Sequence, residues 1–216
     1  MPLRAVIFDY GMVLSAPADP VAHEELVQIF GAPAETFEAQ YWAHRHAYDA
    51  GEFEGRGYWR LCAEGAGVSL TEAQVSQLIE TDIRMWMSLD QAMVDWAIEV
   101  GRAGFRTGIL SNIGEDLVPA LLRFPWVKSF TAKIWSCRLR LAKPDPAIYH
   151  HALERLDVRA GEALFIDDRQ ENILTARAVG MQGVIYRTIP ELHRELQQMG
   201  LAELLPPLPV EPVRAS

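Results

Sequence analysis

Apolar and polar residues follow two different patterns along the chain. The opening segment, Leu3 to Phe8, is a continuous apolar run broken by Asp9 and Gly11, and such a run is typical of a strand buried on both faces. From residue 16 to residue 90 the apolar positions recur at helical spacing, and no convincing strand is indicated. From residue 91 onward, helical segments alternate with short apolar runs. The pattern therefore predicts one strand, an all-helical block and then alternating helices and strands.

The helical block is divided by clear start and stop signals. Asp19 is predicted to be an N-cap with Pro20 at the first helical position, and Gly31 is predicted to close that helix. Ser69 with Glu72 three residues later predicts a capping box at the start of the last helix of the block. The four predicted helices run from Pro20 to Gly31, from Ala34 to Ala50, from Tyr58 to Ala63 and from Leu70 to Met87.

The remaining sequence predicts an α/β core. Further strands are expected at Phe105–Leu110, Phe130–Trp135, Ala163–Asp167 and Gly183–Tyr186, with helices between them and a last helix from Pro190 to Met199. Strands alternating with helices favour a parallel sheet covered on both faces. We therefore predict a Rossmann-like α/β core formed by residues 1–15 and 91–216, with residues 16–90 inserted as an all-helical cap. The proline-rich tail, LPPLPVEPVRAS, is predicted to fray.

Composition and charge narrow the class of protein. The chain has 216 residues, and its 29 acidic and 20 basic residues give a formal net charge of −9, which argues against nucleic acid or an anionic membrane as a partner. The two cysteines form no CxxC pair, so a reducing compartment is expected. The N-terminal apolar run is too short for a signal peptide or a membrane span. We expect a cytoplasmic protein; the sequence indicates no oligomeric state.

Four short polar segments follow four of the predicted strands: Asp9, Ser111-Asn112, Lys143 and Asp167-Asp168. Parallel strands place their carboxyl ends along one edge of a sheet, so these segments can converge. Three carboxylates near one lysine cannot all stay ionised without a further cation. Mg²⁺ suits such oxygen ligands and would let a carboxylate approach a phosphate dianion. The sequence thus predicts a magnesium-assisted site for phosphoryl transfer.

The order of these segments, with a helical insert after the first, resembles the haloacid dehalogenase superfamily. The resemblance covers nearly the whole chain and is most specific from GILSN through KPDPAIY to FIDDRQENILTARAVGM. Within the superfamily it is most similar to bacterial α-D-glucose-1-phosphate phosphatases and to the phosphatase domain of soluble epoxide hydrolase. The resemblance implies an aspartyl-phosphate mechanism with Mg²⁺.

The resemblance also implies roles for individual residues. The metal-binding group comprises Asp9, which is also the nucleophile, the backbone carbonyl of Gly11, and Asp168. The remaining roles fall to Ser111 as the phosphate-binding hydroxyl with Asn112 beside it, Lys143 as the lysine that steadies nucleophile and phosphate, and Asp167 and Asn172 as supporting residues.

One position departs from the usual pattern. Most relatives have a second aspartate two residues after the nucleophile, as general acid and base, whereas this chain has Gly11. The glucose-1-phosphate phosphatase branch also has glycine there. The departure is consistent with a good leaving group, with an acid from the cap, or with a slower enzyme. True 2-haloacid dehalogenases have tyrosine at that position, and here Tyr10 stands one residue short of it.

The cap contributes further candidates. The segment YDAGEF joins two predicted helices where related caps reach the substrate, so Tyr48, Asp49 and Glu52 are predicted to bind substrate. His44 and His46 are two residues apart on a helix and cannot chelate one ion together. We expect them on the surface or in cap packing, unless one faces the site. Trp42, Trp59 and Trp86 are expected mostly in the cap core, and Trp96 between a helix and the sheet. Arg169 is expected on a helix surface, and would reach the phosphate only if its side chain turned inward.

We therefore predict an Mg²⁺-dependent hydrolase, a phosphatase of a small phosphorylated metabolite such as a sugar phosphate. Two alternatives remain open. The first is another enzyme of the superfamily, either a dehalogenase or a phosphonate hydrolase. The second is a non-catalytic protein that binds a ligand but has lost the general acid at Gly11.

Overall fold

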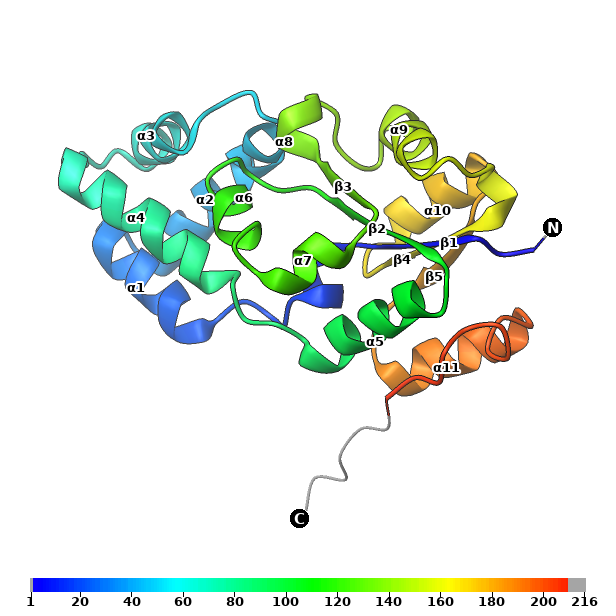
Figure 1. The fold of residues 1–216 in the computed structure, drawn as a ribbon. Coiled ribbons are helices and arrows are strands. Elements are labelled where there is room, and N and C mark those ends of the chain that lie inside the picture. The colour runs from blue at the N-terminus through cyan, green and yellow to red at the C-terminus, as the bar shows by residue number, and fades with distance from the viewer. Residues whose placement is uncertain (1, 210–216) are drawn as a thin grey trace, which may run out of the picture.

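The strand β1 (Ala5–Phe8) is the centre of a parallel sheet in the computed structural model, which describes residues 2–209 (Figure 1). The five-stranded sheet has the order β3-β2-β1-β4-β5. The other strands are β2 (Arg106–Ser111), β3 (Ala132–Trp135), β4 (Ala163–Asp167) and β5 (Gln182–Ile185). The chain adds strands on one side of β1 and then on the other, so the order reverses between β1 and β4. Ligands bind beyond the carboxyl ends of the strands at such a reversal.

Helices cover both faces of the sheet, which confirms the predicted α/β class. Along β1, Val6 and Phe8 face one apolar cluster and Ala5 and Ile7 face the other, as alternation along a strand requires. The helices on the first face are α5 (Gln91–Arg102), α6 (Leu117–Leu121), α7 (Pro125–Ser129) and α11 (Ile189–Gln198), and those on the second are α9 (Pro146–Leu156) and α10 (Gln170–Ala178). Trp96 of α5 packs edge-on against Phe8 with ring centroids 5.7 Å apart, so its predicted place between helix and sheet is confirmed.

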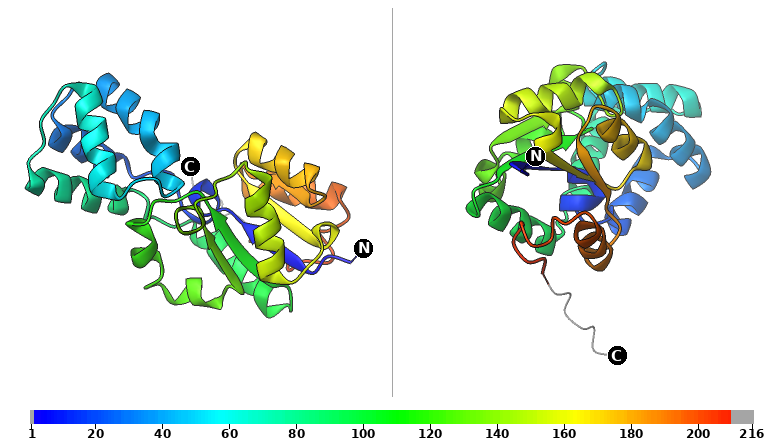
Figure 2. Two further views of the ribbon diagram at one scale, coloured as in Figure 1. Left: turned by 90° about the horizontal axis from the view of Figure 1, so that it is seen from above. Right: turned by 90° about the vertical axis from the view of Figure 1, so that its right-hand side faces the viewer.

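The segment after β1 forms a helical lobe beside the core (Figure 2). Its helices are α1 (Pro20–Phe30), α2 (Ala34–Asp49), α3 (Gly55–Ala66) and α4 (Glu72–Met85). This cap has an apolar cluster of its own, which contains Leu26, Phe37, Trp59 and Leu78. Because the cap buries its own cluster, it can fold as an insertion without interrupting the core.

The start of α1 agrees with the sequence-based prediction, and the start of α4 differs from it. Asp19 caps α1 by accepting a hydrogen bond from the Val21 backbone N–H at 2.8 Å, as predicted. The predicted capping box of Ser69 and Glu72 is wrong. Thr71 caps α4 instead: its hydroxyl accepts from the Gln74 N–H at 3.3 Å, and the Gln74 side chain accepts from the Thr71 N–H at 3.0 Å. Thr71 and Gln74 have the same three-residue spacing as Ser69 and Glu72 but stand two residues later in the sequence. With the helix beginning at Glu72, apolar residues of α4 such as Val75 and Leu78 lie in the cap core.

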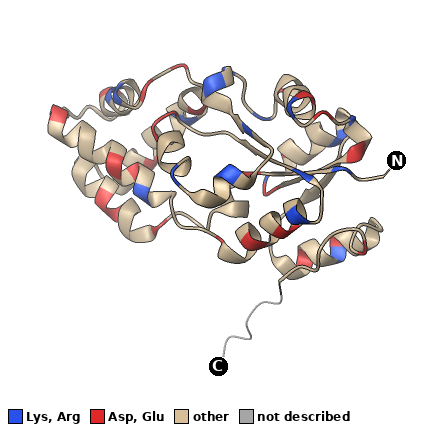
Figure 3. Ribbon diagram, viewed as in Figure 1, with Lys and Arg blue, Asp and Glu red and all other residues tan. Residues whose placement is uncertain are grey.

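Three short segments complete the fold. They are the turn Tyr10–Leu14 after β1, the helix α8 (Ser136–Leu139) after β3 and the 3₁₀ turn Ala160–Glu162 before β4. No helix of residues 2–209 is both long and apolar enough to cross a membrane. Figure 3 shows acidic and basic positions interspersed over the cap and the core helices. Residues 210–216 of the proline-rich tail lie outside the described residues.

Candidate active site

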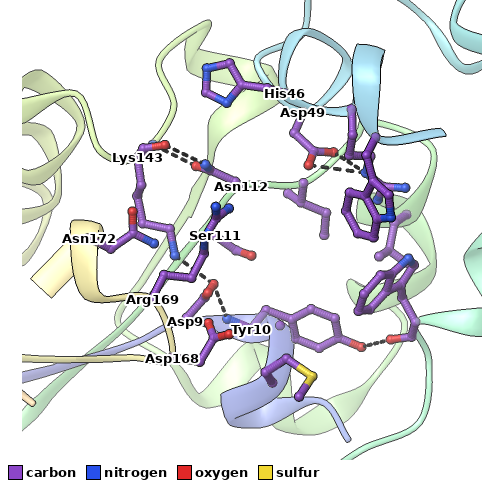
Figure 4. Close-up of a pocket in the computed structure, with 17 residues that line it drawn as sticks. Asp9, Tyr10, His46, Asp49, Ser111, Asn112, Lys143, Asp168, Arg169 and Asn172 are labelled. Carbon is purple, nitrogen blue, oxygen red and sulfur yellow. Dashed lines mark hydrogen bonds and ion pairs between the residues drawn. The ribbon is translucent and has the colours of Figure 1, made fainter. Parts of the chain in front are cut away.

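The four polar segments predicted at strand ends meet at one edge of the sheet (Figure 4). Asp9 follows β1 directly, Ser111 ends β2, and Asp168 follows the last residue of β4. Lys143 comes from the loop that precedes α9. These residues line a cavity of about 570 Å³, and residues of the cap and further core residues form its other walls. Residues from most of the chain length are thus brought to one site.

Lys143 forms ion pairs with two carboxylates of this site. Its ammonium nitrogen lies 2.9 Å from Asp9 Oδ1 and 2.6 Å from Asp167 Oδ2, and its side chain is 1% exposed. Burial by itself disfavours the charged ammonium, but the two carboxylates outweigh that effect and raise the pKa of Lys143 above its usual value. The lysine therefore stays charged and holds Asp9 in place.

Asn112 fixes the backbone of Lys143. Its side-chain oxygen accepts from the Lys143 N–H at 2.7 Å, and its amide nitrogen donates to the Lys143 carbonyl at 2.8 Å. A bidentate contact of this kind restrains both the loop and the Asn112 side chain. Asn112 lines the cavity as predicted, and the structure adds that it orients the lysine.

The tight turn after β1 presents Asp9. The Tyr10 N–H donates to Asp9 Oδ1 at 2.7 Å, and the turn closes with a hydrogen bond from the Ser15 N–H to the Tyr10 carbonyl at 2.7 Å. Met12 has a φ of 58°, in the left-handed region, and its N–H donates to the Ser15 hydroxyl at 3.1 Å. Tyr10 and Lys143 both contact Oδ1, which leaves Oδ2 of Asp9 without a contact from either group.

The charge state of Asp9 depends on cations. Burial, helped by the negative charge of the neighbouring Asp167, raises the pKa of Asp9 to about 7 against the lowering effect of Lys143. Burial also raises the pKa of Asp168, and Asp167 adds to that effect. A divalent cation would stabilise the ionised form of both carboxylates. The site thus needs more positive charge than Lys143 alone provides.

Three carboxylates are close enough to hold such an ion: oxygens of Asp9, Asp167 and Asp168 lie within 4.8 Å of one another. Asp167 is already occupied, since it accepts from Lys143, from the Asn172 amide at 2.9 and 3.0 Å, and from the Arg169 N–H at 2.8 Å. Asp9 and Asp168 are therefore the better ligands, and both line the cavity, as does Gly11. This oxygen-only set fits Mg²⁺, which would supply positive charge for binding a phosphoryl group. Asp167 and Asn172, which were predicted to support the site, contact each other, and Asp167 contacts Lys143.

The cap wall of the cavity comes from one face of α2 and from the end of α4. On α2 the lining residues are Trp42, Arg45, His46 and Asp49, and the residue after α4 is Trp86. The four α2 positions follow the spacing i, i+3, i+4, i+7, which is one side of a helix. Asp49 was predicted to bind substrate, and it lies on this wall.

Tyr48 and Glu52, the other two cap candidates, do not line the cavity. The Tyr48 hydroxyl donates to Asp116 at 2.7 Å, and its ring stacks on Tyr58 with centroids 4.6 Å apart. Glu52 is exposed in the turn after α2. The segment was predicted to reach the substrate, and α2 ends at Asp49, close to the predicted Ala50. The side of the helix that Tyr48 occupies faces Asp116 at the cap-core contact and not the cavity.

Sequence reasoning missed Arg45 and misplaced Trp42. Arg45 is buried and pairs with Asp49 at 3.1 Å and with Asp82 at 3.2 Å, while its guanidinium lies 5.2 Å from the Tyr41 ring centroid. Trp42 was expected in the cap core, but its surface is 55% exposed and it lines the cavity, whereas Trp59 is buried as expected. The helical stripe of polar and aromatic residues was the signal that could have identified this wall.

His46 and Arg169 also line the cavity. His46 was expected on the surface unless it faced the site; it is exposed and lies on the cavity wall. Arg169 likewise lines the cavity, and its guanidinium pairs with Glu171 at 2.7 Å. Both are therefore within reach of a bound ligand.

A parallel α/β core with an aspartate after its first strand, a buried lysine and a helical cap defines a class of capped hydrolases. A family model described as haloacid dehalogenase-like hydrolase matches residues 4–180, and the chain belongs to this family. Bifunctional epoxide hydrolase 2 of Sus scrofa is 31% identical over 157 residues, which are 69% of this chain and 28% of that protein. This chain therefore spans less than a third of that relative's length.

Two further similarities each cover most of this chain. The (S)-2-haloacid dehalogenase 1 of Pseudomonas sp. strain CBS-3 is 27% identical over 196 residues, covering 85% of this chain and 84% of that protein. The crystal structure of a family enzyme from Bacteroides thetaiotaomicron, in complex with magnesium and inorganic phosphate, aligns with a TM-score of 0.71 at 18% identity and covers 86% of this chain and 94% of that one. At that identity the alignment shows a shared fold.

Proposed function

We propose that the protein is an Mg²⁺-dependent phosphatase that hydrolyses a small phosphorylated metabolite, such as a sugar phosphate, through an aspartyl-phosphate on Asp9. The observation that carries this proposal is the arrangement of Asp9, Lys143 and Asp168 on the floor of the cavity, with Oδ2 of Asp9 available. The magnesium and phosphate bound by the Bacteroides enzyme of the same fold support it.

The residues of the site have distinct roles in the two steps of the reaction. Oδ2 of Asp9 attacks phosphorus, and the Lys143 ammonium and the Ser111 hydroxyl hold the oxygens of the transferring group, whose charge must be stabilised in the transition state. The alcohol leaves, and water then hydrolyses the acyl-phosphate on Asp9. Asn112 and Asp167 keep Lys143 oriented through both steps.

The test is a panel of phosphate monoesters assayed with Mg²⁺ and with a chelator. We expect the wild type to release phosphate only with the metal, and Asp9→Asn to fall to the assay background, because an amide oxygen cannot form the acyl-phosphate. Asp145→Asn is the matched control, since Asp145 caps α9 and does not line the cavity. Full activity of Asp9→Asn would overturn the proposal.

A dehalogenase is the second candidate, favoured by the similarity to the Pseudomonas enzyme over 85% of this chain. Release of halide from 2-haloacids that survives chelation of divalent metal would support it. Trapping of a lysine Schiff base with borohydride would indicate a phosphonate hydrolase instead. A protein that binds Mg²⁺ and phosphate and turns over none of the panel would be a ligand-binding member of the family.

A further inference from the structure

The cavity contains one carboxylate that neither attacks phosphorus nor binds metal in the proposed function. The carboxylates that line it are Asp9, Asp49 and Asp168, and the first and last already have roles. Gly11, where many relatives place the acid, has no side chain. A phosphate ester with a poor leaving group still needs a proton on the departing oxygen. Asp49 is therefore the lining carboxylate to which the proposed function assigns no role.

Asp49 is held at the end of α2 and lies on the cap wall. Its carboxylate accepts from the Arg45 Nε–H at 3.1 and 3.3 Å, and its side chain is 13% exposed. Its backbone carbonyl accepts from the Ser136 hydroxyl, which ties this end of α2 to the core. Figure 4 shows Asp49 across the open middle of the cavity from Asp9. A substrate bound on Asp9 thus has its leaving group on the side of Asp49.

The charges around Asp49 favour retention of a proton. One guanidinium, that of Arg45, contacts both Asp49 and Asp82, so two carboxylates with little exposed surface share one positive charge. Asp82 also accepts from the Tyr41 hydroxyl at 2.7 Å. Burial raises the pKa of the Asp49 carboxyl, Arg45 lowers it, Asp82 raises it and the nearby His46 lowers it, with a net upward shift. A carboxyl group whose pKa is raised is a better proton donor at the pH of catalysis than an ordinary ionised aspartate.

We propose that Asp49, presented by the cap, performs the proton transfers for which Gly11 has no side chain; the proposal rests on the phosphatase function above. In the first half-reaction the Asp49 carboxyl gives its proton, directly or through one water, to the ester oxygen as the P–O bond breaks and the bond from Asp9 Oδ2 to phosphorus forms. In the second, the Asp49 carboxylate takes a proton from water as the water oxygen attacks phosphorus and the bond to Asp9 breaks. Alcohol and phosphate leave, and both aspartates return to their starting states.

The experiment compares kcat/KM for two esters on each variant, since this parameter reports departure of the leaving group. 4-Nitrophenyl phosphate has a leaving group that needs no proton, whereas glycerol phosphate releases an alkoxide that does. We expect Asp49→Asn to lower kcat/KM for glycerol phosphate by about 10²–10⁴-fold and to change the value for 4-nitrophenyl phosphate by much less. The ratio of the two values does not depend on the fraction of folded enzyme, so a partly unfolded preparation still gives an answer.

Two further variants complete the test. Glu52→Gln makes the same charge change in the turn after α2, away from the cavity, and we expect it to leave both values unchanged. Gly11→Asp combined with Asp49→Asn should regain activity on glycerol phosphate, because it returns a carboxyl beside Asp9. Equal losses on both esters, or no loss on glycerol phosphate, in Asp49→Asn would overturn the proposal. A wild type inactive on both esters would instead overturn the phosphatase function itself.

Discussion

Glycine at position 11 is not required by the backbone. Its φ of −60° and ψ of 131° are open to any residue, and a Cβ placed there would have no neighbouring atom within 4 Å. Glycine is demanded where φ is positive or where another group approaches closely, and neither applies here. The absence of a side chain at Gly11 is therefore a chemical property of this chain and can be changed without strain.

Gly11→Asp should accordingly restore function to a chain that lacks the Asp49 carboxyl. In the Asp49→Asn background we expect it to raise kcat/KM for glycerol phosphate by about tenfold or more, within the range that a positioned general acid provides. Gly11→Asn is the control, because it has the same shape and cannot transfer a proton. If the two variants behaved alike, the effect of position 11 would be steric.

Asp82 sets the pH range of Asp49 in the proposed mechanism. Asp82→Asn removes a negative charge beside Arg45, so Arg45 then neutralises Asp49 alone and the pKa of Asp49 falls. The fraction of protonated Asp49 at neutral pH decreases, and the limb of the pH profile for glycerol phosphate should move to lower pH. The profile for 4-nitrophenyl phosphate should not move, and a parallel shift for both esters would contradict the role of Asp49.

At the scale of elements, the end of α2 determines how the cap meets the core. Gly51, just after α2, has a φ of 77°, and a Cβ there would lie 2.2 Å from the backbone oxygen of Cys137. On the facing loop, a Cβ at Gly114 would lie 2.2 Å from the Tyr48 ring. The end of α2 approaches Cys137 and the loop that contains Gly114 so closely that only glycine fits at positions 51 and 114. This contact fixes the orientation of the helix face that carries Arg45 and Asp49.

Gly51→Ala should therefore loosen the contact between cap and core. The matched control is Gly67→Ala, since Gly67 has a similar φ of 68° and open space around its Cβ position. We expect Gly51→Ala to lower the free energy of unfolding by about 1–3 kcal/mol more than Gly67→Ala, because it adds a clash with backbone to the same conformational strain. Urea denaturation of both variants measures the difference, and equal losses would show that the contact carries no energy.

At the scale of the whole molecule, stability should be linked to metal binding. An ion that binds only the folded chain, at a concentration of about 100 times its Kd, stabilises it by about 2.7 kcal/mol. For a chain of this size that corresponds to a rise in Tm of about 5–10 °C. We expect this rise with MgCl₂ by thermal unfolding, with NaCl at equal ionic strength as the control. Asp168→Asn should abolish it, and an unchanged rise in that variant would place the ion elsewhere.

The strands and the core site were predictable because their determinants are local. The apolar run of β1 and the polar residues that end β1, β2 and β4 stand in the sequence, and parallel strands have only one way to bring such ends together. The start of α1 at Asp19 and Pro20 was equally local. The start of α4 was not: Ser69 and Thr71 are both capable caps, and the packing of its apolar face against the other cap helices decided between them.

The sequence alone determined the parallel core, the helical insertion and the convergence of Asp9, Ser111, Lys143 and Asp168, since strand order and residue type suffice for each. Only the tertiary structure decided which cap residues face the site. The face that α2 presents depends on contacts between residues distant in the sequence, such as the one between Tyr48 and Asp116. For that reason Arg45 and Asp49 line the cavity while Tyr48 and Glu52 do not.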